Sequence, residues 1–322
     1  MSHKIEWVVL GASVAGTSHI QSNMPCQDAH LVLQMEVGDA GSILIVAVAD
    51  GASSAVFSQQ GAVMAVDVAV SSIAEAIEML VRPLSGSSAA LPERGQQADD
   101  VDCQSSSWKD TAQKDAIDWQ QLVQNAFQVS HAAIAAHAQT QQHSISDYHT
   151  TLVLAVVTGE EVIAGMIGDG AVVAERNVEI EQVVGQDISI NIEETDSVQQ
   201  TELVSLCQPQ RGEYANSTYF LTQPNFTEHV TIDTHAGRYK AVAVLTDGLL
   251  PLAMNIAKNR PHRPFFEPLF KFVQSVAADD QGDEQEIVTG QEHLATFLDS
   301  ARINQRTDDD KTLVVAVRKR TK

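Results

Sequence analysis

Short apolar segments bounded by glycine and acidic residues recur along the chain. Five of them, about five to seven residues each and rich in valine, isoleucine and alanine, occupy residues 43–49, 151–157, 162–167, 241–245 and 313–317. This length and composition are typical of buried strands rather than helices. Only a short turn around Gly159 separates the second segment from the third, so we expect these two strands to pair antiparallel.

Apolar side chains recur at helical spacing in four longer segments, at residues 59–82, 117–137, 265–277 and 292–302. In the first of them, one face carries Val63, Val66, Val70, Ile73, Ile77 and Leu80. In the second, the same spacing selects Trp119, Val123, Ala126 and Ile134. An apolar stripe of this kind predicts a helix that packs one face against the protein core.

Two polar segments interrupt this pattern. Residues 83–115, rich in serine, glutamine and aspartate, are expected to form a mobile surface loop, and residues 279–286 a second, acidic loop. No internal repeat occurs, and acidic motifs that need one another lie on both sides of the loops, so we expect residues 1–322 to form a single domain. Antiparallel strands separated by pairs of helices predict an α+β fold, a sandwich of two antiparallel sheets flanked by helices.

Charge and composition limit what such a domain can bind. The chain has 322 residues, 44% of them apolar, and its 42 acidic side chains against 20 Lys and Arg give a net charge of −22. Such a surface repels nucleic acid and anionic membranes, and no segment matches a signal peptide or a transmembrane helix. Cys26, Cys103 and Cys207 are widely spaced and fit neither a zinc site nor a disulfide framework. We therefore expect a cytoplasmic protein with reduced thiols and neither a nucleic acid nor a membrane partner.

Aspartates stand at the ends of the predicted strands. Asp50 and Asp247 each follow a strand and precede a glycine, whereas Asp309 and Asp310 stand just before the last strand. In an antiparallel sheet the end of one strand neighbours the start of the next, so these positions can converge at one rim. Crowded carboxylates repel one another unless cations separate them, and carboxylate oxygens favour hard ions such as Mg²⁺ or Mn²⁺. The following glycine lets the chain turn sharply and exposes a carbonyl that can add a ligand.

The same motifs have other interpretations. Asp-Gly is a common turn dipeptide, and one copy would indicate no more than a turn. Here it follows a buried strand three times, at residues 50–51, 169–170 and 247–248, which favours a site. Other phosphate chemistries fit less well: Thr17 takes the place of the lysine that a P-loop needs, and Leu245 takes that of the nucleophile in a haloacid-dehalogenase loop.

Eight short segments carry a resemblance to a known family. They are GASVAGTSH at 11–19, CQDA at 26–29, VADGAS at 48–53, HTTLVLAVV at 149–157, MIGDG at 166–170, GEYANSTYFLT at 212–222, LTDG at 245–248 and TDDDKTL at 307–313. In this order, the segments resemble the metal-dependent 2C-type Ser/Thr protein phosphatases, especially their bacterial branch. The resemblance implies an αββα sandwich with a two-metal centre between the sheets. It also implies a flap within residues 171–240 that influences substrate choice.

The resemblance implies a ligand role for several residues at these motifs. Asp50 would bridge two Mn²⁺ or Mg²⁺ ions, one of them also bound by the Gly51 carbonyl. Asp247 and Asp309 would complete the shell of the other ion.

Two further acids match outer positions of the family's centre. Asp28 would bind a metal through water, and Asp169 would hold a third, weaker ion, so the centre is expected to contain two or three ions. The acids with a direct part in catalysis would be Asp28, Asp50, Asp247 and Asp309.

The chain departs from the family pattern at two places. Asn23 stands where many members carry an arginine that grips the substrate phosphate, and Ala52 where many carry a histidine proposed as a general acid. His19 and His149 are the nearest histidines within the motifs, although a lone histidine is more often structural than catalytic. The groups that hold the phosphate and protonate the leaving oxygen are therefore unassigned.

The implied function is hydrolysis of phosphoserine and phosphothreonine in one step, by water that two metal ions activate. The substrates would be phosphorylated proteins, and a Ser/Thr kinase would be the opposing enzyme in a signalling pathway. Two other interpretations stay open. One is a non-catalytic phosphoprotein-binding regulatory module on the same fold, motivated by Asn23 and Ala52. The other is a structural cation-binding protein, which explains the acids but not the order of the motifs.

Overall fold

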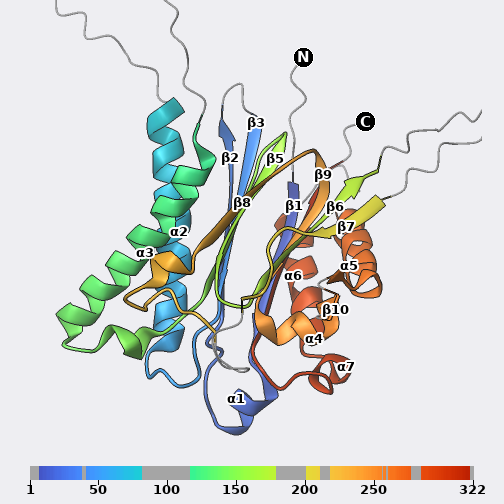
Figure 1. The fold of residues 1–322 in the computed structure, drawn as a ribbon. Helices are drawn as coiled ribbons and strands as arrows, with labels where there is room; N and C mark the ends of the chain where they lie inside the picture. The colour runs from blue at the N-terminus through green and yellow to red at the C-terminus, as the bar shows by residue number, and fades with distance from the viewer. Residues whose placement is uncertain are drawn as a thin grey trace, which may run out of the picture.

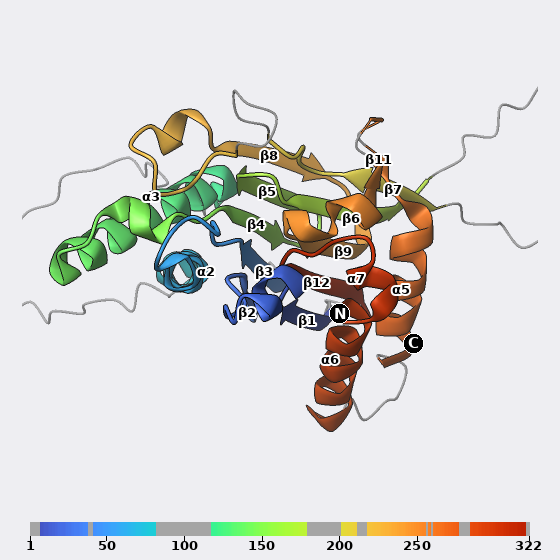
Figure 2. The ribbon, with the colours of Figure 1, turned by 90° about the horizontal axis from the view of Figure 1, so that it is seen from below.

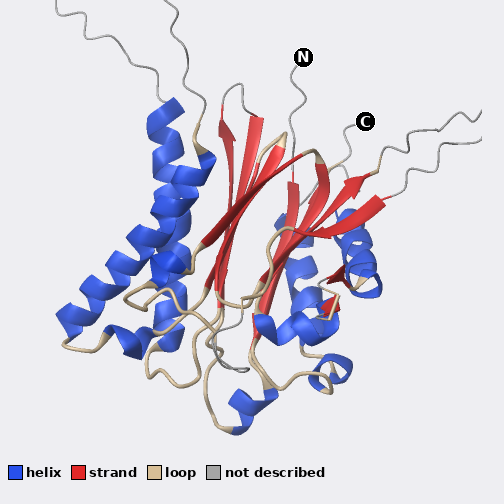
Figure 3. Ribbon diagram, viewed as in Figure 1, coloured by secondary structure: helices blue, strands red, loops and turns tan. Residues whose placement is uncertain are grey.

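The computed structural model describes residues 7–37, 41–81, 117–178, 201–210, 218–255, 257–258, 260–276 and 284–319. Within them, two five-stranded antiparallel sheets face each other and helices cover their outer faces (Figure 1 and Figure 3). This arrangement confirms the α+β sandwich of two sheets flanked by helices that the sequence predicts.

Each sheet brings together strands that are distant in the sequence. The first sheet has the order β1 (Trp7–Val14), β12 (Lys311–Arg318), β9 (Tyr239–Leu245), β6 (Ala171–Asn177) and β7 (Thr201–Ser205). The second has the order β2 (Ala29–Val37), β3 (Gly41–Ala49), β4 (Leu152–Val157), β5 (Glu161–Ile167) and β8 (Thr231–Ala236). In the first sheet β1 and β12 lie side by side, and Ser13 and Thr312 share a side-chain hydrogen bond of 2.7 Å although 299 positions separate them.

Helices form the two outer layers (Figure 2). α2 (Ser58–Val81) and α3 (Trp119–Gln141) pack together over the second sheet, while α5 (Arg263–Val276) and α6 (Glu284–Leu298) cover the first. The shorter elements are α1 (Thr17–Gln21), α4 (Leu250–Ala253), α7 (Ala301–Asn304), the 3₁₀ helices η2 (Ile145–Tyr148), η3 (Phe226–Glu228) and η4 (Asp247–Leu249), and a ribbon of β10 (Met254–Asn255) and β11 (Arg260–Pro261). None of the described helices combines the length and hydropathy that crossing a membrane requires.

The central strands are buried on both faces, which explains their continuous apolar sequence. In β3, Ile43, Ile45 and Ala47 pack against the helices α2 and α3, whereas Leu44 and Val46 fill the space between the sheets. Alternate residues of one strand therefore belong to two different cores. By the same alternation, odd-numbered residues of β4 face the other sheet.

Sequence periodicity identifies the elements that are buried most deeply. The five predicted strands correspond to β3, β4, β5, β9 and β12, and the first three predicted helices to α2, α3 and α5. The strands of the two five-stranded sheets that were not predicted are β1, β2, β6, β7 and β8. Several of these are partly exposed and mix apolar with polar residues; β2, for example, contains His30, Gln34 and Glu36. Such strands lack the long apolar run that made the others recognisable.

Three predictions about helices are wrong. Residues 292–302 do not form one helix, because Ser300 adopts an extended backbone (φ −65°, ψ 149°) that ends α6 before α7 begins. Residues 284–286 begin α6 and are not part of an acidic loop. On α2, Val63 and Leu80 are exposed rather than buried, because the helix packs closely through small residues. These are Gly61, Ala62, Ala65 and Ala69.

Some predictions concern segments that the structure does not describe. The predicted loop at 83–115 and residues 279–283 lie outside the described residues, as does Cys103. Within the predicted flap region, β6, β7 and β8 are described, but residues 179–200 and 211–217 are not. Among the described residues, Cys26 and Cys207 are both free thiols.

Close packing of α2 generates a testable expectation at Gly61. A Cβ atom at this position would collide with the backbone carbonyl of Tyr148 in η2. Gly61→Ala should therefore lower the free energy of unfolding by about 1–3 kcal/mol, in urea denaturation followed by circular dichroism. The control is Ser71→Ala, at an exposed position of the same helix. If nothing obstructed this position, replacing the glycine by alanine would instead raise the free energy of unfolding by about 1 kcal/mol. That result would contradict the described contact.

Candidate metal centre

Three acidic side chains meet at one end of the gap between the sheets. Asp50 follows β3, Asp247 follows β9, and Asp169 lies in the turn that carries the chain from β5 in one sheet to β6 in the other. One carboxylate oxygen from each lies within 4.8 Å of one from each of the others. This is the spacing that oxygen ligands of a shared cation adopt.

Strand register explains why these three residues meet. Leu152 pairs with Ile167, so the start of β4, which borders Asp50, lies beside the end of β5. Ala171 pairs with Leu245, so the turn before β6 lies beside the end of β9. The antiparallel pairings therefore place all three aspartates at the same end of the sandwich.

Asp28 lies beside this group because Ala29 pairs with Ala49, next to Asp50. Its carboxylate is buried, and its Oδ2 accepts a hydrogen bond of 2.8 Å from the Thr246 hydroxyl. Its Oδ1 is also buried and has no hydrogen-bond partner among the described residues. A buried carboxylate oxygen without a donor is free to accept a cation or a water molecule that a cation holds.

Asp309 lies at the edge of the cluster. It is outside the group of three, and its Oδ1 accepts a hydrogen bond of 2.9 Å from the Asp310 backbone N–H. It is close enough for its charge to raise the pKa of both Asp50 and Asp247. The family resemblance implies that Asp309 belongs to the main centre and Asp169 to an outer position. In the structure, Asp169 belongs to the compact group and Asp309 does not.

Burial and mutual repulsion raise the pKa of every carboxyl group in the cluster. Burial, followed by the charge of Asp169, raises the pKa of Asp247 to about 8. Burial also raises the pKa of Asp28 to about 7, and burial together with the charge of Asp28 raises that of Asp50 well above its ordinary value. Bound divalent cations would reverse these shifts by stabilising the charged carboxylates, so the donor set fits hard metal ions.

Asp310 has a different environment from its neighbour Asp309. Its buried carboxylate accepts two backbone hydrogen bonds of 2.6 Å, from Gly16 and Gln27, and its Oδ2 lies 2.9 Å from His19 Nδ1. It therefore ties the loops on either side of α1 to the start of β12. His19, one of the two candidate histidines, is buried in this contact and has a structural role there.

Glycines keep the backbones close together beside the cluster. A Cβ at Gly51 would lie 2.7 Å from the Ser58 carbonyl oxygen and 2.8 Å from that of Gln27. A Cβ at Gly248 would collide with the Asp310 carbonyl. The glycine after each aspartate is thus needed for close approach of neighbouring segments, in addition to the turn that the sequence indicates.

His149, the second candidate histidine, lies opposite Ala52. Gly51 and Thr150 form a β-bridge, and the Ala52 N–H donates a 2.9 Å hydrogen bond to the His149 carbonyl, so residues 52 and 149 lie opposite each other. Even-numbered residues of β3 and odd-numbered residues of β4 point between the sheets. The missing histidine at position 52 therefore has an imidazole directly across from it.

The His149 ring is held in place by two contacts. Its Nδ1 lies 2.6 Å from the Thr222 hydroxyl, and the ring stacks on Phe220 with 4.9 Å between centroids. Its Nε2 has no hydrogen-bond partner among the described residues. Burial lowers the pKa of His149 below its ordinary value. By contrast Asn23, at the position of the missing arginine, is exposed, with a φ of 56° that asparagine tolerates well.

Fold and site together define an αββα sandwich with a carboxylate cluster for hard cations between its sheets. Residues 15–299 match the family Protein phosphatase 2C, and the chain belongs to this family. It is 29% identical over 313 residues to "Serine/threonine-protein phosphatase 3" of Escherichia coli (strain K12), which covers 97% of this chain and 99% of that protein.

Solved structures share the fold. Serine-threonine phosphatase 2C from Toxoplasma gondii matches with a TM-score of 0.53 and 12% identity, covering 99% of this chain and 96% of that one. A bacterial serine phosphatase matches with a TM-score of 0.50 and 12% identity, covering 97% of this chain and 98% of that one. At this level of identity the likeness supports the fold alone.

The raised pKa values predict how the metal-free protein responds to pH. A carboxyl group whose folded-state pKa is raised stabilises the fold fully below its unfolded pKa, and this contribution is lost as pH rises through the folded pKa. For Asp28 and Asp247 the loss extends to about pH 7 and about pH 8. In EDTA, the melting temperature should therefore rise when the pH falls from about 8 to about 6.

Lower net negative charge also favours folding on acidification, so a variant must separate the two effects. Asp28→Asn/Asp247→Asn removes both titrating groups and should reduce the dependence of melting temperature on pH. Saturating Mn²⁺ should abolish that dependence in the unsubstituted protein, because cation binding displaces the protons. Equal slopes for the variant and the unsubstituted protein in EDTA would contradict the assignment.

Proposed function

We propose that the protein is a metal-dependent phosphatase that hydrolyses phosphoserine and phosphothreonine in proteins. The observation that carries the proposal is the compact group of Asp50, Asp169 and Asp247, with oxygens within 4.8 Å, in a chain of the Protein phosphatase 2C family. The name of the Escherichia coli relative supports the substrate class. A Ser/Thr kinase that modifies the same proteins would be the opposing enzyme.

The proposed centre holds two or three Mn²⁺ or Mg²⁺ ions. Asp50, Asp247, Asp309 and the Gly51 carbonyl would hold these ions. When bound, such ions lower the pKa of water and neutralise charge on phosphoryl oxygens.

The two remaining acids complete this arrangement. We propose that Asp28, with one unpartnered carboxylate oxygen, orients a water molecule of the metal shell. The proximity of Asp169 to both Asp50 and Asp247 supports a role within the main centre as well as at a third ion.

The chain's own residues position the reactants. The cluster lies at an end of the gap between the sheets, where the aspartates hold cations and are not available as nucleophiles. A water molecule would therefore attack phosphorus directly, in one step and without a covalent intermediate on the protein. We also propose that the chain forms one domain and that its flap, within residues 171–240, contributes to the choice of phosphoprotein.

Activity should depend on the aspartates and on divalent cations. Asp247→Asn should reduce kcat for a phosphothreonine peptide at least about 100-fold with saturating Mn²⁺, because a charged ligand at the reacting centre is lost. Excess EDTA should abolish turnover, and Mn²⁺ should restore it. Asp67→Asn, on the exposed face of α2, is the matched control and should leave kcat unchanged.

Two outcomes would exclude the proposal. Full turnover in excess EDTA would rule out metal dependence. Absence of turnover with Mn²⁺ bound and phosphopeptide affinity retained would instead identify a non-catalytic phosphoprotein-binding module on the same fold.

We further propose that His149 protonates the leaving oxygen. A seryl or threonyl alkoxide is a poor leaving group, so its departure needs a proton donor within hydrogen-bond distance. His149 lies opposite Ala52, Thr222 and Phe220 fix its ring, and its Nε2 is unpartnered among the described residues. To act as an acid the ring must be an imidazolium, whose Nδ1–H donates to the Thr222 hydroxyl oxygen and whose Nε2–H is left for the leaving oxygen.

The acidity of the leaving group provides a test of this role. His149→Ala should slow hydrolysis of a phosphoserine peptide by about 10²–10⁴-fold, the usual contribution of a general acid. It should slow 4-nitrophenyl phosphate far less, because nitrophenolate leaves without protonation. A purely structural role would slow both substrates equally, and that result would contradict the proposal.

A second substitution tests the geometry. Because residues 52 and 149 lie opposite each other, Ala52→His in the His149→Ala background places an imidazole on the same side of the sheet. It should restore part of the peptide activity. His137→Asn serves as a control, since its Nε2 contacts the Gln60 side chain between α3 and α2.

A further inference from the structure

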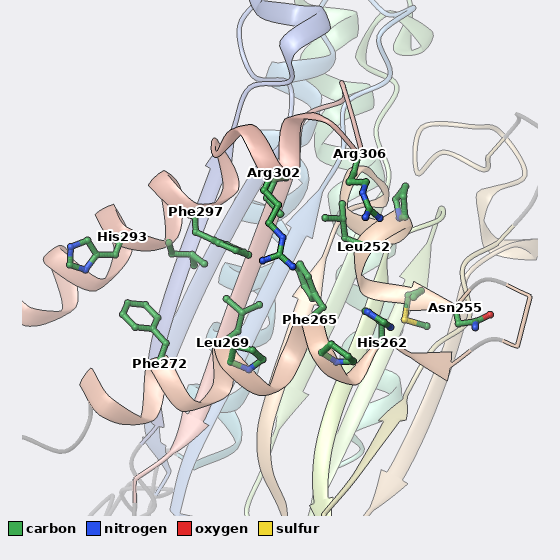
Figure 4. Close-up of a pocket in the computed structure, with 16 residues that line it drawn as sticks. Leu252, Asn255, His262, Phe265, Leu269, Phe272, His293, Phe297, Arg302 and Arg306 are labelled. Carbon is green, nitrogen blue, oxygen red and sulfur yellow. The ribbon is translucent and has the colours of Figure 1, made fainter.

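A cavity lies in the helical layer outside the first sheet, and none of the clustered aspartates lines it. It has a volume of about 720 Å³ and is enclosed by α4, α5, α6, α7 and the start of the β10–β11 ribbon (Figure 4). Its walls are apolar and largely aromatic: Leu252, Phe265, Leu269, Phe272 and Phe297. Pockets of about 300–1,000 Å³ with such walls are typical of small-molecule sites.

The ionisable side chains that line this pocket are all basic. Its 16 lining residues include Arg302, Arg306, His262 and His293, but no aspartate or glutamate among those the structure describes. The chain as a whole carries 42 acidic residues against 20 Lys and Arg. The pocket therefore has the opposite charge balance to the rest of the protein.

The two arginines have no partner in the described part of the chain. Arg302 extends from α7 across the pocket between Phe297 and Phe265, and Arg306 lies beside Leu252 (Figure 4). Neither forms an ion pair or a side-chain hydrogen bond with a described residue, whereas Arg176 and Arg238 each pair with a glutamate. Guanidinium groups beside an apolar cavity are well suited to bind carboxylate or phosphate oxygens.

We propose that this pocket binds a small amphipathic anion, with its carboxylate or phosphate head at Arg302 and Arg306 and its apolar chain against the aromatic wall. The argument rests on charge complementarity, because two cations without partners stand at the opening of an apolar cavity in a protein of net charge −22. Phe265 and Leu269 are buried at the base of the pocket and supply the apolar contact. Binding at this site does not depend on the proposed phosphatase activity.

Isothermal titration calorimetry with ten-carbon probes tests the proposal on the whole chain. Decanoate should bind with one-to-one stoichiometry and at least about tenfold more tightly than decyltrimethylammonium, because the arginines form charge-assisted hydrogen bonds with its head. Non-specific attraction to this acidic protein would favour the cationic probe instead. Decyl phosphate, measured in parallel, identifies the preferred head group by its affinity relative to decanoate.

Variants locate the binding site. Arg302→Gln/Arg306→Gln should weaken decanoate binding at least about tenfold, through loss of both charged donors. Arg176→Gln/Arg238→Gln changes the net charge equally but lies outside the pocket, and it should leave the affinity unchanged. The proposal is overturned by an equal loss in both variants, by equal affinity for the cationic probe, or by the absence of binding of both decanoate and decyl phosphate.

Discussion

Burial of several carboxyl groups within a few ångströms of one another opposes folding, because each loses hydration and each repels its neighbours. Asp28, Asp50 and Asp247 are in this situation, and their pKa values rise accordingly. The antiparallel register places them together. It brings the ends of β3, β5 and β9 and the starts of β2 and β12 to one end of the sandwich. Cations at the proposed centre would relieve this repulsion, and the glycines and Asp310 hold together the backbones that carry the carboxylates.

The sequence predicted the parts of the molecule whose pattern depends on burial. Strands covered on both faces, such as β3 and β4, are continuous apolar runs, and their ends located Asp50. Strands with one exposed face, such as β8 with its Asp233 and His235, mix polar and apolar residues and were not recognised. Without β6 and β8, the crossing between the sheets at Asp169 could not be placed, so its position beside Asp50 emerged only from the structure.

Other features of the site depend on contacts between segments that are distant in the sequence, which the pattern of one segment cannot predict. Asp309 and Asp310 are adjacent acids of the same type, yet one faces the cluster and the other accepts hydrogen bonds from Gly16 and Gln27. The relation of His149 to Ala52 exists only because β3 and β4 share a register, across a sequence separation that local patterns do not cover. The cavity beside Arg302 likewise arises from the break between α6 and α7, which periodicity predicted as one helix.

The position of β12 has a consequence for the order in which the protein becomes functional. β12 lies between β1 and β9, so the first strand has no neighbour in its sheet until residues 311–318 are present. The same segment follows Asp309 and carries the carboxylate of Asp310 to the Gly16 and Gln27 amides. A nascent chain that has not yet reached these residues lacks a complete first sheet and the acids at its end. Under the proposed function, emergence of β12 during synthesis would set the moment at which the metal centre can form.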